Sequence, residues 1–484
     1  MLPSKQHAAE IVRALRDHGH QAYFAGGCVR DLLLSREPAD YDVATDATPH
    51  QVMQIFPQTY AVGEQFGVVL IPFKADTTTD SKEHEGDEPL RTDPFDGRVV
   101  PGAMGGSGKQ RYLFLSPSLR KSVEVATFRS DVSYSDGRHP DEVRFTKDPR
   151  EDVQRRDFTI NGMMLDPTTN EILDYVGGRD DLKAGIVRAI GDPNRRFTED
   201  KLRMLRAVRF AARFDYQIDP ATLAAIQKLA LKIHQVSCER VSEELTKMLT
   251  EGQASRAFKL LDTTRLLPEV LPEIAAMKGV EQPPQFHPEG DVFVHTLLLL
   301  DKLPRGASKT LAWGALLHDV GKPATFRVAP DRIRFDGHVD VGVKMAAEIC
   351  RRLRFSNDET DQILALVDNH MRFGQVQRMN QSTLKKFLRL PAFEEHLELH
   401  RIDCLSSHGQ LDAYEYAQDQ LRSMPPEAIR PAPLITGQDL IEAGYEPGPR
   451  FKEVLSAVED AQLEGRLTSR EAAMDFVRRE FPVE

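Results

Sequence analysis

The sequence predicts an α+β protein in which a mixed α/β domain is followed by an all-α remainder. Short apolar runs separated by turn residues occur between residues 23 and 165, and such runs are typical of strands. From about residue 166 onward, apolar residues recur with helical spacing instead. The Pro-rich segment EQPPQFHPEG marks a further boundary near residue 285. We therefore expect an N-terminal domain over 1–165 and three helical parts over 166–284, 285–410 and 411–484.

The composition excludes several classes of protein. A chain of 484 residues can bury several cores, and its net charge of -11 disfavours a general nucleic-acid coat, although not a local basic groove. The four cysteines are scattered without a CxxC pair, which predicts no zinc or disulfide framework and favours a reducing, cytoplasmic location. No apolar run approaches the ~20 residues of a membrane span, so we expect no membrane partner.

The N-terminal domain contains a glycine turn that suits a phosphate group. The run AYFA before the turn predicts a strand, and CVRDLLL after it predicts a helix; the other expected strands are VVLIPF, VEVATF and VRFT. Gly26 and Gly27 would then lie at a helix N-terminus, where backbone N–H groups can bind phosphate oxygens, and Arg30 lies within the first turn of that helix. A plain turn is the alternative interpretation.

Carboxylates follow the glycine turn. Asp40 and Asp42 are two residues apart, so in an extended chain they project from the same face, and two adjacent carboxylates suit Mg²⁺. Glu124 lies in a run rich in β-branched residues and could be a third acid around two Mg²⁺ ions. An outward-facing strand position is an equally good interpretation of Glu124, and a solvated loop is the alternative for the aspartates.

Two arginine-rich segments come next. In EDVQRRDFTING, Arg155 and Arg156 suit triphosphate oxygens, and Asp157 can accept a hydrogen bond from a ribose hydroxyl; a salt-bridge cluster at a helix end is the alternative. In RRFTEDKLRMLRAVRFAARF, arginines share one helical face, which predicts an anionic partner because stacked arginines repel one another. Asp200 and Arg203 could together read the edge of a base, and Arg206 and Arg209 continue the arginine face.

The motifs GGCVRD, DYD, EVATFR, RRDFTING and EDKLRMLRAVRF, in this order, resemble those of the bacterial class II tRNA nucleotidyltransferases and poly(A) polymerases. The resemblance lies within the first 250 residues. It implies a polymerase β-type nucleotidyltransferase head, a helical neck, and body and tail helices that hold tRNA.

The resemblance also implies a role for each matching residue. Asp40 and Asp42 would bind Mg²⁺, whereas the placement of Glu124 stays open because an insertion at 74–110 departs from compact members of the family. The nucleotide-binding residues would be Gly27, Arg30 and Arg156 for the nucleotide, Asp157 for the choice of ribose, Asp200 and Arg203 for the base of CTP or ATP, and Arg206 and Arg209 as their support.

A second set of residues suited to metal binding begins at EGDVFVHTLLLL. It comprises an adjacent His-Asp pair and distant partners within helical patterns: His295, His318, Asp319, His338, His370 and Asp403. Imidazoles and carboxylates from separate helices can converge on one divalent metal. The set resembles an HD-type metal-dependent phosphohydrolase domain over 285–410. This resemblance implies that His295, His318, Asp319 and Asp403 bind a metal such as Ni²⁺, Mn²⁺ or Co²⁺, with His338 and His370 available for a second metal or a phosphate.

These expectations favour template-independent transfer of CMP and AMP, from CTP and ATP, to the 3′ end of tRNA, with two Mg²⁺ ions assisting the release of pyrophosphate. The segment RSDVSYSDGRHPDEVRF resembles the flexible loop of family members that add A, which disfavours addition of C alone. Addition of A alone, polyadenylation, and a mainly HD-type phosphohydrolase activity are the alternatives. A tRNA-binding module without catalysis is disfavoured, because binding alone does not require clustered carboxylates that face a polyanion.

Overall fold

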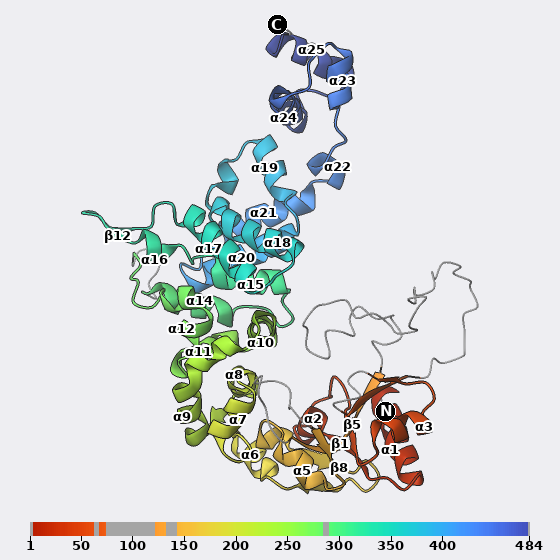
Figure 1. Cartoon of the computed structure of the whole chain (residues 1–484). Coiled ribbons are helices and arrows are strands. Elements are labelled where there is room, and N and C mark those ends of the chain that lie inside the picture. The colour runs from red at the N-terminus through yellow and green to blue at the C-terminus, as the bar shows by residue number, and fades with distance from the viewer. Residues whose placement is uncertain (1–2, 62–66, 74–121, 132–142, 284–289, 483–484) are drawn as a thin grey trace. The chain divides into compact units, whose positions relative to one another are not determined.

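The computed structural model describes residues 3–61, 67–73, 122–131, 143–283 and 290–482 (Figure 1). Contacts within the chain define two compact units: the first comprises Met1–Lys247 and Lys259–Val270, and the second comprises Met248–Phe258 and Leu271–Glu484. The expected insertion at 74–110, and most of the segment that resembles a flexible loop, lie outside the described residues.

The first unit contains a seven-stranded sheet with the strand order β3-β4-β5-β2-β1-β8-β9. Strands β2 and β5 are parallel, and the other neighbouring strands are antiparallel. The strands are β1 (Ala22–Ala25), β2 (Val43–Thr45), β3 (Tyr60–Ala61), β4 (Val68–Pro72), β5 (Ser122–Thr127), β8 (Met163–Leu165) and β9 (Ile172–Asp174). A separate pair is formed by β6 (Arg129–Asp131) and β7 (Val143–Phe145). The strands expected at AYFA, VVLIPF, VEVATF and VRFT are thus confirmed as β1, β4, β5 and β7.

Short helices accompany this sheet: α1 (Pro3–Asp17), α2 (Gly27–Leu33), α3 (Pro49–Ile55), α5 (Pro149–Gln154) and α6 (Gly178–Ala184). Helix α1 buries Ala8, Ile11, Val12 and Leu15, whose spacing places them on one face, and this face packs against β1 and β2. Burial of the apolar face therefore explains the amphipathic pattern of the N-terminal segment.

Strands also occur beyond residue 166, where the sequence predicts only helices. Strand β9 completes the edge of the main sheet, and two further pairs join β10 (Ile186–Val187) to β11 (Gln217–Ile218) and β12 (Arg327–Val328) to β13 (Ile333–Arg334). Runs of two or three residues are too short to show an alternating pattern. The all-α description of the remainder was therefore wrong in detail, although helices dominate it.

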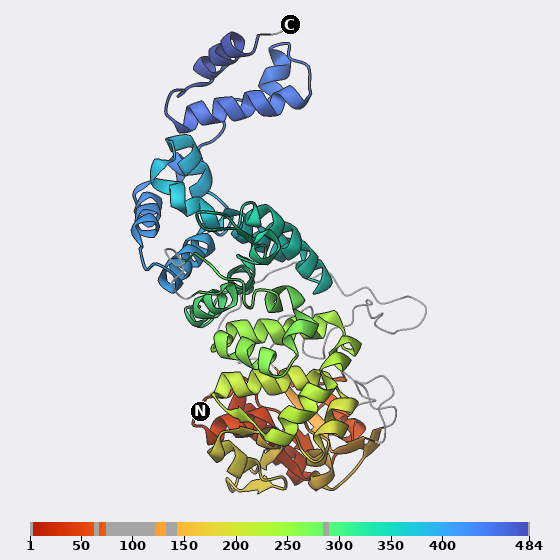
Figure 2. The same cartoon turned by 90° about the vertical axis from the view of Figure 1, so that its left-hand side faces the viewer.

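The rest of the first unit is helical and forms a stacked layer (yellow to green in Figure 2). Its helices are α7 (Pro193–Glu199), α8 (Leu202–Phe214), α9 (Pro220–Leu229), α10 (Cys238–Thr250), α11 (Ala254–Thr263) and α12 (Leu267–Val270), with a 3₁₀ turn at Ala230–Gln235; the end of α10 and the start of α11 belong to the second unit. Most of α8 is buried, including Phe210 and Phe214. Asp200 has an extended backbone with φ -142° and interrupts the helical run between α7 and α8.

The second unit is a helical bundle followed by smaller helices (Figure 1). The bundle comprises α13 (Pro272–Ala275), α14 (Val292–Asp301), α15 (Lys309–Leu317), α16 (Lys322–Thr325), α17 (His338–Arg352), α18 (Asn357–Asn369), a 3₁₀ segment at His370–Arg378, α19 (Gln381–Leu388), α20 (Phe393–Ser406) and α21 (Asp412–Ser423). Helices α14 and α15 are apolar on nearly all sides because they lie inside the bundle, where Leu299, Trp313 and Leu316 are fully buried.

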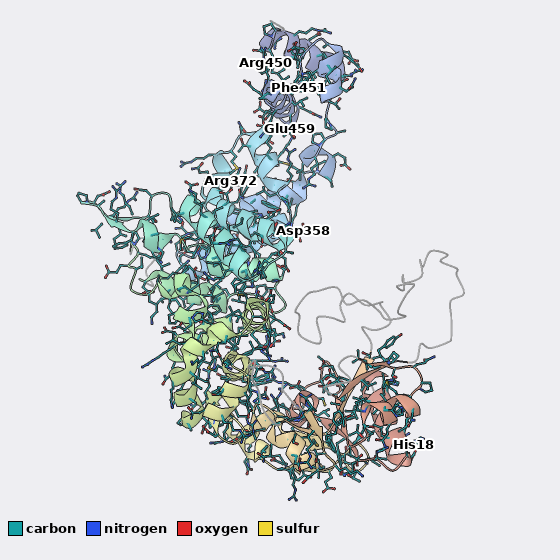
Figure 3. The ribbon with its side chains drawn as sticks, viewed as in Figure 1. His18, Asp358, Arg372, Arg450, Phe451 and Glu459 are labelled. Atoms are coloured by element: carbon teal, nitrogen blue, oxygen red, sulfur yellow. The ribbon has the colours of Figure 1, made fainter. Side chains whose placement is uncertain are left out.

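The last three helices, α23 (Gly437–Glu442), α24 (Pro449–Leu463) and α25 (Arg470–Glu480), have a core of their own, formed by residues such as Leu440, Val458 and Val477. The short helix α22 (Pro426–Ile429) precedes them, and its Ile429 packs into the core that contains Phe373 and Phe387. Glu459 on α24, labelled in Figure 3, forms an ion pair with Arg389, which directly follows α19; the nitrogen and oxygen atoms are 2.7 Å apart. Among the described residues, no helix is long and apolar enough to cross a membrane.

Two histidines on α20, the buried His396 and the half-buried His400, predict that acid destabilises the bundle. Burial lowers the pKa of both His396 and His400 from 6.5 to about 4, and neither ring nitrogen of His396 has a hydrogen-bond partner in the described part of the chain. The unfolded chain therefore binds more protons between pH 6.5 and 4, so the free energy of unfolding falls as the pH falls through this window, by up to about 3 kcal/mol per histidine.

Replacing His396 by leucine should remove its share of this pH dependence and raise the melting temperature at pH 5. Thermal unfolding at pH 7 and pH 5 measures both effects. His408→Leu, at an exposed position of the same unit, is the matched control and should leave the pH dependence unchanged. Equal pH dependence in the wild type and His396→Leu would contradict the assignment.

Candidate active site and candidate metal centre

Two of the predicted acids, Asp42 and Glu124, lie side by side at the start of β2, and Asp40 comes two residues before Asp42. Asp40 and Asp42 immediately precede this strand, and the N–H of Ala25 donates to the carbonyl of Asp42 at 3.0 Å, which extends the β1–β2 pairing. In the parallel pairing of β2 with β5, Val43 lies opposite Val125, and both are buried. The preceding positions, Asp42 and Glu124, therefore lie side by side on the opposite face. Asp42 and Glu124 are half-buried, and Asp40 is exposed.

The glycine turn packs against a guanidinium group. Gly26 has φ +79°, and a Cβ there would lie 3.0 Å from Nη1 of Arg156. Arg156 is held in this position by Oδ2 of Asp152, which accepts from its Nε at 3.2 Å and from its Nη2 at 2.9 Å. Burial opposes ionisation of Asp152, but Arg155 and Arg156 together lower its pKa to about 2. The turn, the start of α2 and a fixed cation thus lie together, as an anion site requires.

Arg30 is buried and contacts protein groups. Its Nη1 donates to Oδ1 of Asn161 at 2.6 Å, its Nε donates to Oδ1 of Asp31 at 2.9 Å, and its guanidinium carbon lies 4.6 Å from the ring centre of Phe214. Burial lowers its pKa despite the neighbouring carboxylate. Arg30 therefore joins α2 to α8, and its contact with a nucleotide stays a prediction.

The arginine face of α8 is neutralised by the protein itself. Arg206 donates to Oδ2 of Asp157 from Nε at 2.9 Å and from Nη2 at 2.7 Å. Arg209 donates to Oε2 of Glu244 at 2.7 Å, and Arg203 lies 3.1 Å from a carboxylate oxygen of Glu199 on α7. The sequence did not reveal these carboxylate partners, which come from other segments of the chain, and the anionic partner of this face stays a prediction.

Asp157 connects the sheet to the helical layer. Its Oδ1 accepts from the backbone N–H of Phe158 at 2.8 Å and from Nδ2 of Asn161 at 3.2 Å, while Oδ2 accepts from Arg206. Although burial raises the pKa of this carboxyl, Arg206 lowers it to about 2. Both oxygens of Asp157 therefore have protein donors, and its role in choosing ribose stays a prediction.

Asp200 and Arg203 lie on one turn at the start of α8, where the N–H of Arg203 donates to the carbonyl of Asp200 at 3.2 Å. The carboxylate of Asp200 accepts from the N–H of Leu202 at 3.0 Å and from Nη2 of Arg240 at 2.9 Å. The structure thus adds Arg240 and Glu244, both on α10, to the residues predicted from the sequence. Their spacing of four residues on an amphipathic helix was the available signal, but it did not identify their partners.

The second candidate site is built from five segments of the bundle. Its residues lie within or at the ends of the helices: His295 on α14, His318 and Asp319 after α15, His338 at the start of α17, His370 after α18, and Asp403 on α20. Close backbone packing brings two of these segments together. A Cβ at Gly321 would lie 2.1 Å from the carbonyl oxygen of His338, so only glycine allows α16 to begin beside α17.

Asp319 lies at the centre of this cluster. Its Oδ2 is 3.2 Å from Nε2 of His318 and 3.9 Å from Nε2 of His295, and its Oδ1 is 3.8 Å from Nε2 of both His338 and His370. Asp403 approaches His295 at 3.1 Å. Two groups of possible ligands result, His295-His318-Asp319 and Asp319-His338-His370, and in each the ligand atoms lie within 4.8 Å of one another.

The imidazoles are oriented as metal ligands. The Nδ1 atoms of His318, His338 and His370 lie 2.9, 2.9 and 2.7 Å from backbone carbonyls three residues earlier, so each Nδ1 carries the proton and each Nε2 has a free electron pair. These three Nε2 atoms are buried and make no hydrogen bond in the described structure. Burial lowers the pKa of His370 to about 4 and also lowers that of His338, which keeps both rings neutral.

The carboxylates of the cluster are ionised. Burial opposes the charge, but the Lys322 ammonium holds the pKa of Asp319 well below its usual range, and the neighbouring His295 does the same for Asp403. Neutral imidazoles with unpaired Nε2 atoms and ionised carboxylates are the donor set that a divalent transition metal requires. The residues present therefore fit a metal centre, with Asp319 shared by both ligand groups.

Comparisons with known proteins match the regions of the chain that contain the two candidate sites. Residues 22–89 and 104–188 match the Poly A polymerase head domain, residues 215–278 match a probable RNA and SrmB-binding site of polymerase A, and residues 291–403 match the HD domain. The CCA-adding enzyme of Geobacillus sp. (strain WCH70) is 30% identical over 471 residues, which cover 96% of this chain and 93% of that enzyme. The chain belongs to the CCA-adding enzyme family.

Other CCA-adding enzymes are similar to this chain in sequence or in structure. The enzyme of Bacillus pumilus is 34% identical over 315 residues, which span 63% of that enzyme. The crystal structure of the Bacillus stearothermophilus CCA-adding enzyme in complex with CTP is similar over 99% of both chains, with a TM-score of 0.70 and 26% identity. The Thermotoga maritima enzyme complexed with tRNA has the same fold, with a TM-score of 0.55, 17% identity, and coverage of 98% of this chain and 94% of that one.

In this member of the CCA-adding family, we expect replacement of Arg240 to change the choice between nucleotides. Arg240→Leu removes the guanidinium that holds the Asp200 carboxylate, and a hydrogen bond between charged groups contributes enough energy for about a tenfold change. We expect the preference for CTP over UTP, measured as the ratio of kcat/KM values on tRNA lacking its 3′ CCA, to fall about tenfold.

Lys247→Gln is the matched control, because Lys247 is a partly exposed cation on the same helix whose partner is Glu243. It should leave nucleotide preference unchanged. A normal preference in Arg240→Leu would show that Asp200 does not need this partner.

Proposed function

We propose that this protein adds cytidylate and adenylate, from CTP and ATP, to the 3′ end of tRNA without a template. The observation that carries the proposal is that Asp42 lies beside Glu124. Asp40 is two residues away along the chain, and the glycine turn nearby packs against Arg156. The names of the similar proteins support it, since they are CCA-adding enzymes and one is in complex with CTP. Addition of A alone and polyadenylation are the alternative activities within the family.

Asp40 and Asp42 are the residues that would hold Mg²⁺, with Glu124 as the third acid. Bound there, Mg²⁺ would supply Lewis-acid activation of the attacking hydroxyl and neutralise the leaving pyrophosphate. The Gly26–Gly27 turn and Arg156 would bind the triphosphate, and Asp200 with Arg203 would select the base. Support for these roles comes from the fixed geometry of the side chains and from their order along the chain.

The test is to incubate the protein with tRNA that ends at the discriminator base, in C or in CC, with each nucleotide separately, and to sequence the 3′ ends. Ordered growth to CCA supports the proposal. Growth by A alone, or by a long run of A, supports one of the alternatives, and no growth rejects nucleotide addition.

A second candidate function concerns the metal centre in the bundle. We propose that it binds a divalent transition metal such as Ni²⁺, Mn²⁺ or Co²⁺ and hydrolyses phosphate esters; the buried, unpaired Nε2 atoms of His318, His338 and His370 favour this function. Phosphatase activity that depends on these metals and disappears in His318→Ala tests it.

A cytoplasmic location is also proposed, because all four cysteines are free.

A further inference from the structure

A buried lysine shares the central carboxylate of the metal centre. Nζ of Lys322 lies 2.7 Å from Oδ2 of Asp319, the same oxygen that faces His295 and His318. Only 6% of Lys322 is exposed, so water cannot replace this carboxylate as a partner. A metal held by His295 and His318 would therefore bind the same Asp319 oxygen as the Lys322 ammonium group. The two positive charges repel each other there.

Gln282 supplies the second hydrogen-bond partner of this ammonium group. Its Oε1 accepts from Nζ of Lys322 at 2.6 Å, and the ring centre of Phe335 lies 5.5 Å from the same nitrogen. Gln282 is only 2% exposed, and among the described residues its buried Nε2 has no hydrogen-bond partner. Burying an amide N–H without a partner costs free energy, which the bond from Lys322 to Oε1 offsets in this orientation. Its orientation is therefore set by the bond to Lys322.

The position of Gln282 is fixed by its backbone. The N–H of Gln282 donates to the carbonyl of Gly290 at 2.8 Å, and the neighbouring Glu281 forms a β-bridge with Asp291. Gln282 lies between the segments that match the RNA-binding region, which ends at 278, and the HD domain, which begins at 291. Neither match therefore includes this contact with the metal centre.

We propose that Gln282 is a positioning residue of the metal centre. Gln282 keeps the Lys322 ammonium group hydrogen-bonded while a metal binds the shared oxygen of Asp319. The inference rests on the proposed metal binding. When a cation binds beside His295 and His318, Lys322 loses much of its attraction to Asp319. Gln282 is then the neutral acceptor that keeps the buried ammonium hydrogen-bonded. Without it, Lys322 depends on Asp319 alone and competes more strongly with the metal.

The test is calorimetric titration of the full-length protein with Ni²⁺, where binding at this centre is the part of the signal that His318→Ala removes. Gln282→Met keeps the volume but not the acceptor, and it should weaken this binding about tenfold, the effect of one hydrogen bond to a charged group. Gln282→Glu keeps an acceptor for Lys322 and should restore at least the wild-type affinity. Nucleotide addition should be unchanged in each variant.

Removal of the lysine separates positioning from packing. Lys322→Met removes the competing charge and should strengthen Ni²⁺ binding, and adding Gln282→Met to it should then have no further effect. An equal loss of affinity from Gln282→Met in both backgrounds would overturn the inference, because Gln282 would then act by packing alone. If the wild type shows no binding that depends on His318, the metal centre fails together with the inference, whereas nucleotide addition is tested independently.

Discussion

Replacing Asp42 by asparagine should reduce nucleotide addition about a thousandfold or more. Asp42 lies beside Glu124 and two residues after Asp40, so its charge is needed to hold a metal that contributes several kcal/mol of transition-state stabilisation. Each 1.36 kcal/mol corresponds to a factor of ten in rate. The measurement is incorporation of labelled CTP and ATP into tRNA that lacks its 3′ CCA.

Asp46→Asn is the matched control for this experiment. Asp46 follows the other end of the same strand, where its carboxylate accepts from the backbone N–H of Gln21, and asparagine keeps an oxygen acceptor there. This variant should remain active. Glu124→Gln then separates the two interpretations of that residue, since a large loss of activity identifies a metal ligand and a normal rate identifies a plain strand position. Normal addition by Asp42→Asn would reject the site.

Replacing Asp319 by asparagine should abolish metal binding in the bundle and leave nucleotide addition intact. Asp319 offers one oxygen to His295 and His318 and the other to His338 and His370, so loss of its charge affects both ligand groups. The same change leaves the Lys322 ammonium buried without its counter-ion, and breaking a buried ion pair costs about 3–5 kcal/mol. The melting temperature should therefore fall as well.

The double variant Asp319→Asn with Lys322→Met distinguishes the two consequences. It should recover much of the lost stability, because no unpaired charge is left, but it should not recover metal binding. Asp336→Asn, at an exposed carboxylate that pairs with Arg327, is the control and should change neither property. Metal binding that survives in Asp319→Asn would reject Asp319 as the shared ligand.

Local features of the chain could be read from its sequence. The strand AYFA, the Gly26 turn and the helix that follows are determined by neighbouring residues, since apolar runs and glycine conformations act over a few positions. The HD residues were identified in the same way, because each stands in a recognisable short motif. Strands of two or three residues, such as β10 and β11, were missed because such short runs cannot show the alternation of apolar and polar residues that identifies a strand.

The arginine face of α8 shows where this reasoning stops. Helical spacing places Arg203, Arg206 and Arg209 correctly along α8, but it does not reveal that they pair with Glu199, Asp157 and Glu244. A charge can be neutralised by any segment that packs against it. Pairing across segments therefore depends on tertiary structure rather than on the pattern of one helix.

The sequence by itself determined the α+β class, the local elements, and the residue types that suit phosphate and metal chemistry. Only the tertiary structure decided that Asp42 lies beside Glu124, which is 82 positions away in the chain, and that Gln282 bonds to Lys322 at the metal centre. Periodicity and turn preferences act between near neighbours, whereas strand register and the pairing of buried charges are set by the packing of distant segments.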